Sequence, residues 1–201
     1  MNNLRILQAL RLKGRAQECD VAQTLNADAG EIHAALEDVI AAGLVTRGTL
    51  LTLSPAGRDR LAELLAGERS SVDSAAMAAT YADFRSVNAD FKALMTDWQL
   101  NDGQPNDHTD SSYDDAVLAR LDALHDTVMQ IVADASTQVP RLGNYGTKLA
   151  GAWERVKAGD VAWLTRPIAD SYHTVWFELH EELIGAAGLS RQEEARAGHA
   201  G

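Results

Sequence analysis

Apolar positions recur at spacings of three and four along most of the chain, which is typical of helices that bury one face. In the first third this pattern is short and broken by glycines. It predicts three helices, at residues 4–13, 19–25 and 29–42. Gly14 and Gly43 follow the first and third of these, as glycine often does at a helix C-terminus. Asp28 is well placed to cap the third helix.

A hairpin and a fourth helix are expected next. The run "LVTRGTLLTL" contains two short β-branched stretches around Arg47 and Gly48, which indicates two strands joined by a tight turn. Ser54 followed by Pro55 then marks a helix start, and Gly67 marks its end. Three helices, a hairpin and a fourth helix form the order of a winged helix.

The rest of the chain predicts longer helices. Their expected ranges are residues 70–100, 113–137, 140–157 and 171–188. Asp170 is the expected cap of the last one, residues 101–112 read as a polar loop, and the tail after Leu189 is expected to fray. The predicted fold class is therefore mainly α, with a winged-helix domain at residues 1–69 and an all-α helical bundle at residues 70–201.

Charge separates the same two parts. Residues 1–69 carry 8 Lys and Arg against 9 Asp and Glu, whereas residues 70–201 carry 10 against 20. An acidic bundle repels nucleic acid and anionic membrane, so any DNA contact must come from the first part. The bundle is expected to serve dimerisation, ligand sensing or both.

The third helix is poorly equipped to read DNA. Its expected outward face consists of small or acidic residues and one histidine: Gly30, His33, Ala34, Glu37 and Ala41. No lysine or arginine occurs between Arg15 and Arg47, while six acids do. Base readout needs donors on this face, and phosphate binding needs several cations.

The candidate DNA-binding residues therefore surround this helix. They are the basic or polar residues Arg5, Lys13, Arg15, His33, Arg47, Thr49 and Arg58. An ordinary solvated surface also carries such residues, and both interpretations stay open.

The first part resembles the MarR-like winged-helix regulators over about residues 3–67. Their run after the wing, "LT-x-x-G-R", has a counterpart here in "LTLSPAGRDRL", offset by one residue. The resemblance implies a winged helix that binds double-stranded DNA. Winged helices also dock proteins, so the fold leaves the partner open.

Aromatic side chains are concentrated in the bundle and suggest a pocket for a small apolar or aromatic effector. The candidate lining is Trp98, Tyr145, Trp153, Tyr172, His173, Trp176, Phe177 and His180. A tryptophan-rich core is the alternative. His173 and His180 lie two turns apart, about 10.5 Å, which is too far to share one ion.

The acidic run "NDHTDSSYDD" lacks the glycine and terminal glutamate of an EF-hand loop, so we expect it to cap a helix and to bind no metal. No cofactor motif or catalytic constellation is present either, and the chain is not expected to be an enzyme. The lone Cys19 is expected to be buried, and a reducing cytoplasm is the expected location. No apolar run is long enough to span a membrane.

A second resemblance concerns the bundle. The segments "FKALMTDWQL", "NDHTDSSYDD" and "DSYHTVWFELHEEL" are similar to a helical region of actinobacterial proteins of the phosphoenolpyruvate-utilising dikinase type. The resemblance implies an accessory or regulatory subunit whose winged helix contacts protein.

Two functions are thus expected. The first is a cytoplasmic transcriptional regulator, a homodimer because the helix at residues 72–100 has more apolar surface than the small domain can cover. The second is the accessory subunit of a dikinase-like enzyme, without DNA binding.

Overall fold

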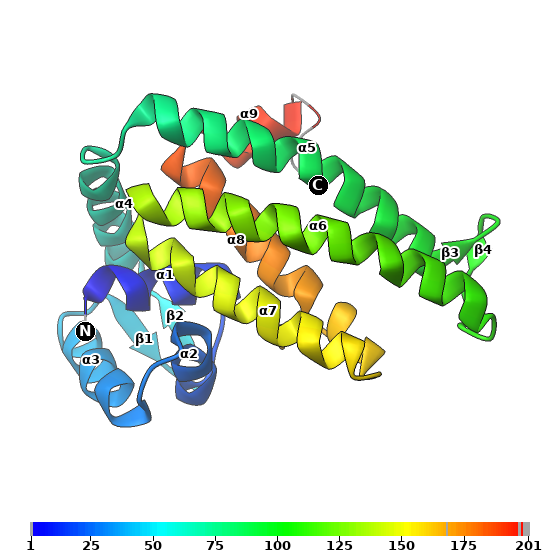
Figure 1. Ribbon diagram of the computed structural model, residues 1–201. Coiled ribbons are helices and arrows are strands. Elements are labelled where there is room, and N and C mark those ends of the chain that lie inside the picture. Colours follow the sequence, from blue (N-terminus) through cyan, green and yellow to red (C-terminus); the bar gives the residue numbers. More distant parts are fainter. Residues whose placement is uncertain (1, 168, 197, 199–201) are drawn as a thin grey trace.

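The computed structural model describes residues 2–167, 169–196 and 198. The chain is mainly helical, and two small antiparallel hairpins make up the β structure of these residues (Figure 1). Buried apolar side chains form two clusters, one drawn from residues 6–61 and the other from residues 77–184. The predicted fold class is confirmed at the level of a mainly helical chain.

The N-terminal part contains its elements in the predicted order. They are α1 (Asn3–Lys13), α2 (Glu18–Leu25), α3 (Ala29–Ala41), β1 (Val45–Arg47), β2 (Leu51–Leu53) and α4 (Pro55–Arg69). The two strands pair antiparallel, and an isolated bridge joins Ala16 to Leu51, so the α1–α2 connection lies against β2. α4 continues past the expected end at Gly67.

Gly57 allows α4 to pack against the chain that precedes β1. A Cβ atom at this position would lie 1.9 Å from the carbonyl oxygen of Leu44, which is backbone and cannot rotate away. The cap of α4 fixes the same corner, because the Ser54 hydroxyl donates to the carbonyl of Gly43 and accepts from the Gly57 N–H. This close contact explains why a glycine stands at this position of the "LTLSPAGRDRL" run.

The C-terminal part is a bundle of long helices. Its elements are α5 (Ser74–Gln99), β3 (Leu100–Asn101), β4 (Gln104–Pro105), α6 (Ser111–Gln138), η1 (Pro140–Leu142), α7 (Gly143–Lys157), η2 (Val161–Leu164), α8 (Tyr172–Ala186) and α9 (Arg191–Arg196). α5, α6 and α7 follow one another side by side, and α8 contacts α5, α7 and α4 (Figure 1). α8 therefore contacts both the other bundle helices and the N-terminal part.

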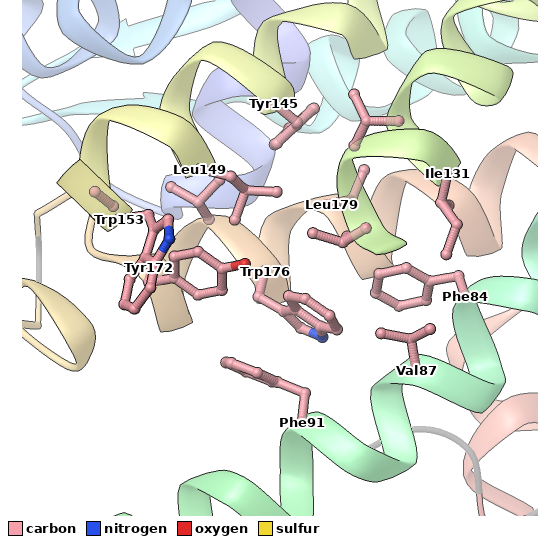
Figure 2. Packing of buried hydrophobic residues seen from close by; sticks show 14 of the residues in the cluster. Phe84, Val87, Phe91, Ile131, Tyr145, Leu149, Trp153, Tyr172, Trp176 and Leu179 are labelled. Atoms are coloured by element: carbon pink, nitrogen blue, oxygen red, sulfur yellow. The ribbon is translucent and has the colours of Figure 1, made fainter. Parts of the chain in front are cut away.

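Trp176 of α8 packs among aromatic rings in the core of the bundle (Figure 2). Its ring centroid lies 4.1 Å from that of Phe91 and 5.3 Å from that of Phe84, both on α5. Its Nε1 donates to the Asn88 side chain at 2.9 Å, so the buried indole N–H is satisfied. The apolar face of α5, which was the reason to expect a dimer, is covered within the chain.

Several local predictions were wrong. The expected loop at residues 101–112 includes the β3–β4 hairpin, whose turn uses positive φ at Asp102 and Gly103, so the bundle is not purely helical. Ser171 caps α8 instead of Asp170, and α9 forms in the tail that was expected to fray. Cys19 lies on the outside of α2 and is exposed rather than buried.

Candidate functional site

The exposed face of α3 is the first candidate surface. Asp28 caps the helix by accepting the N–H groups of Gly30 and Glu31, and Ile32 and Leu36 are fully buried. As predicted, the residues that face outward are all exposed: Gly30, His33, Ala34, Glu37 and Ala41. Because the caps and the apolar spacing agree, the direction of this face follows from the local sequence alone.

Acidic side chains neutralise the cation of the hairpin. Arg47 on β1 lies 2.6 Å from Glu37 Oε1 on α3 and 3.8 Å from Glu18 Oε2 on α2. Glu18 also contacts His33, whose Nδ1 lies 2.8 Å from Glu18 Oε1. Such half-exposed pairs contribute little free energy. Their consequence is electrostatic, since one cation here faces two carboxylates.

Two of the candidate DNA-binding residues have structural partners. Arg5 donates to the carbonyl of Leu25 at 3.0 Å and so joins α1 to the end of α2. The side chain of Lys13 is only 13% exposed and lies between two carboxylates of the bundle. Both side chains thus join parts of the fold, and the charge of Lys13 is also neutralised by its carboxylate partners.

The other candidates are at the surface. Arg15 and Thr49 are exposed, as is Arg58, whose guanidinium donates to the carbonyl of Leu53 at 3.0 Å. The bridge between Ala16 and Leu51 brings the segment of Arg15 next to the hairpin. The structure thus leaves three candidates near the hairpin with no carboxylate partner among their described contacts.

A cluster of four charges joins α1 to the bundle. The Lys13 Nζ lies 2.8 Å from both Asp170 Oδ1 and Glu178 Oε1. The Lys148 Nζ lies 2.8 Å from Glu178 Oε2 and 3.4 Å from Asp170 Oδ1. Burial lowers the pKa of Lys13, but Glu178 and Asp170 outweigh it and the net shift is upward. Two cations and two anions therefore balance, which is what buried charges require.

A second ionic cluster joins α4 to α8. Arg141, in η1, donates from Nη1 to Glu182 at 2.6 Å and from Nη2 to Glu68 at 2.9 Å. Tyr145 donates its hydroxyl to the same Glu182. Burial raises the pKa of Tyr145 and the Glu182 carboxylate adds to this, so the phenol stays protonated. Both clusters hold the N-terminal part against α8.

Four of the eight candidate pocket residues line one hollow. His173, Trp176, Phe177 and His180 of α8 line a cavity of about 230 Å³ whose other wall is α5, with Lys92 on that wall. Burial lowers the pKa of both histidines, so their neutral forms are favoured.

The other four predicted pocket residues lie elsewhere. Trp98 packs on His108 beside the β3–β4 hairpin, and the Tyr145 hydroxyl donates to Glu182 in the second ionic cluster. Trp153 and Tyr172 pack edge to face in the core (Figure 2). For these residues the alternative of a tryptophan-rich core describes the structure.

The acidic run after the hairpin caps and crosslinks its own loop. Asp110 caps α6, Asp107 accepts from Thr109, and Asp114 contacts His108 and Asn106. Across the described residues, no group of three or more His, Cys, Asp or Glu side chains is arranged to hold a metal ion. Within the same residues, no helix is both long and apolar enough to cross a membrane.

Comparison with known proteins adds no assignment: no family model, curated protein or solved structure matches this chain.

The buried charges are the residues that the sequence pattern did not identify. Glu178 and Glu182 are four apart and lie within the apolar run of α8, and Lys148 directly precedes the buried Leu149. A charged residue at a core-facing position of a helix indicates a buried ion pair, because a buried charge without a partner is costly. Their partners could not be named, since they come from distant parts of the chain.

Proposed function

We propose that this chain is a non-enzymatic regulatory protein of the cytoplasm whose N-terminal part is a winged helix that docks a protein rather than DNA. The order of the elements, with a hairpin between α3 and α4, favours the winged helix. The contact of Arg47 with Glu37 at 2.6 Å is the observation that carries the choice of partner. A winged helix that reads DNA needs cations around its hairpin and third helix. Here the arginine at that place, Arg47, is neutralised by two glutamates.

The chemistry of this surface favours a basic partner. Glu18 and Glu37 flank Arg47, and Glu31 and Asp38 are exposed on α3. Complementary charge raises the association rate and excludes acidic partners such as nucleic acid. The resemblance of the bundle to dikinase-type proteins suggests one such partner, a phosphoenolpyruvate-utilising enzyme with a basic patch.

Calorimetric titration of the purified protein into a dikinase-type enzyme from the same organism tests this proposal. We expect saturable binding that weakens on the order of tenfold when Glu37→Lys reverses one charge of the face. Glu63→Lys is the matched control, because Glu63 is an exposed glutamate on α4 whose partner is Arg60 on the same helix. Equal binding by both variants would contradict docking through α3.

A DNA-binding transcriptional regulator is the second candidate. The exposed Arg15, Thr49 and Arg58 around the hairpin favour it. In that case the α5–α8 hollow is the place for a small aromatic effector, and a homodimer is expected to bind a two-fold symmetric site. Sedimentation equilibrium distinguishes a dimer from a monomer of 21.7 kDa.

A further inference from the structure

A cavity of about 520 Å³ lies between the N-terminal part and α8, away from the exposed face of α3. Its size is within the range of about 300–1,000 Å³ that small-molecule sites occupy. The walls are mainly aliphatic and come from α1, β2, α4, α8 and residues 189–191, where α9 begins. The aliphatic side chains that line it are Leu10, Leu53, Leu61, Leu65, Ile184 and Leu189.

The charged residues of this cavity are biased toward arginine. Arg11, Arg58 and Arg191 line it together with a single carboxylate, that of Glu181. Glu181 is shared, because it pairs with Arg11 at 3.6 Å and with Arg191 through its other oxygen. Three cations and one anion leave an excess of two positive charges, in a chain whose formal net charge is −11.

Among the described residues that line the cavity, Arg58 is the cation without a carboxylate partner, so it can bind an anion. Its Nη1 donates to the backbone carbonyl of Leu53, which holds the guanidinium at the cavity without neutralising it. An arginine has five N–H donors in a planar fork that matches a carboxylate. The aliphatic wall next to this fork would accept a hydrocarbon chain and exclude water from it.

We propose that this cavity binds an amphipathic carboxylate, with its hydrocarbon part against the leucines and its carboxylate on Arg58. A neutral molecule of the same shape would leave the excess positive charge unpaired. Because α4 forms one wall and α8 the other, the bound molecule would also hold the N-terminal part against the bundle. This site goes beyond the docking function proposed above and does not depend on it.

Isothermal titration calorimetry with decanoate, below its micelle concentration and with decanol as the neutral counterpart, tests the proposal. We expect one decanoate per chain and binding on the order of tenfold weaker for decanol and for Arg58→Gln. Arg60→Gln is the matched control, since Arg60 lies on the same helix but pairs with Glu63 and does not line the cavity. It should bind as the parent does.

Two filling variants locate the site. Ala62→Trp places a large ring in the cavity from an exposed position on α4, and Gly185→Leu does so from α8, where an added Cβ meets no atom within 4 Å. Both should abolish decanoate binding while the helical circular dichroism and the urea midpoint stay near those of the parent. Decanoate binding that survives both variants would overturn the proposal, as would no detectable heat at 1 mM decanoate, about the weakest affinity expected for such a site. A parent dimer that Ala62→Trp converts to monomer would also overturn it, because a second copy would then fill the cavity.

Discussion

Replacing Glu178 by glutamine should destabilise the chain by about 3 kcal/mol, at the lower end of the range for breaking a buried ion pair. The Glu178 side chain is 3% exposed and accepts from Lys13 and Lys148, both at 2.8 Å. After the change two ammonium groups share the single carboxylate of Asp170. Glutamine keeps the shape and can accept one hydrogen bond, which is why the lower end applies. Since a domain is stable by about 5–15 kcal/mol, this loss is large.

Urea unfolding followed by circular dichroism at pH 7 measures this loss. We expect the midpoint of Glu178→Gln to fall by about 1 M or more. Glu154→Gln is the control, because Glu154 pairs with Lys157 at 2.6 Å but its side chain is 70% exposed. Such a surface pair should change the midpoint little. Equal midpoints for the two variants would refute the inference that the four-charge cluster joins α1 to the bundle.

Three further predictions follow from the structure. Gly57→Ala should destabilise by about 3 kcal/mol because its Cβ meets the Leu44 carbonyl at 1.9 Å, whereas Gly67→Ala on the same helix meets nothing and should be neutral or stabilising; the two urea midpoints decide. Burial lowers the pKa of His173 and His180, so NMR spectra should show both rings titrating below the usual 6.5, and titration at or above 6.5 would contradict this. The free energy of unfolding should also decrease as the pH falls below 6.5, because the unfolded chain then binds protons that the folded chain does not. Carboxylates raise the pKa of Lys13 against the effect of burial, so its contribution is complete below 10.5 and is lost as pH rises through its folded value; Lys13→Met should therefore flatten the fall in stability above pH 10.5, and an unchanged fall would count against the ion pairs.

Features set by neighbouring residues could be predicted from the sequence. The direction of α3 followed from its Asp28 cap and the spacing of Ile32, Leu36 and Val39, all of which act within one helix. The hairpin followed from two β-branched runs around a glycine. The hollow at His173, Phe177 and His180 was partly foreseen, because one stripe of a single helix lines it.

Features set by distant contacts could not be predicted. Lys13 was expected at the surface, but its partner Asp170 is 157 residues away, and no local pattern indicates that pairing. The same contact explains the wrong cap of α8, because serine and aspartate both cap well and Asp170 is used by the lysines. Trp153 lies on α7, and Trp98 lies on α5 but packs on His108 instead of lining the hollow. Their aromatic character alone could not show this, because it depends on how the helices pack.

Fluorescence anisotropy with DNA duplexes tests the central claim, that the acids around Arg47 direct this surface to protein rather than DNA. The duplexes are the upstream region of the gene itself and a random sequence of equal length, at low salt. We expect no saturable binding of the parent protein at micromolar concentration. The variant with both Glu18→Gln and Glu37→Gln should show weak binding to both duplexes, because Arg47 then loses its counter-charges. Salt-dependent binding of the parent protein to its upstream region, lost in Arg47→Gln, would contradict the claim.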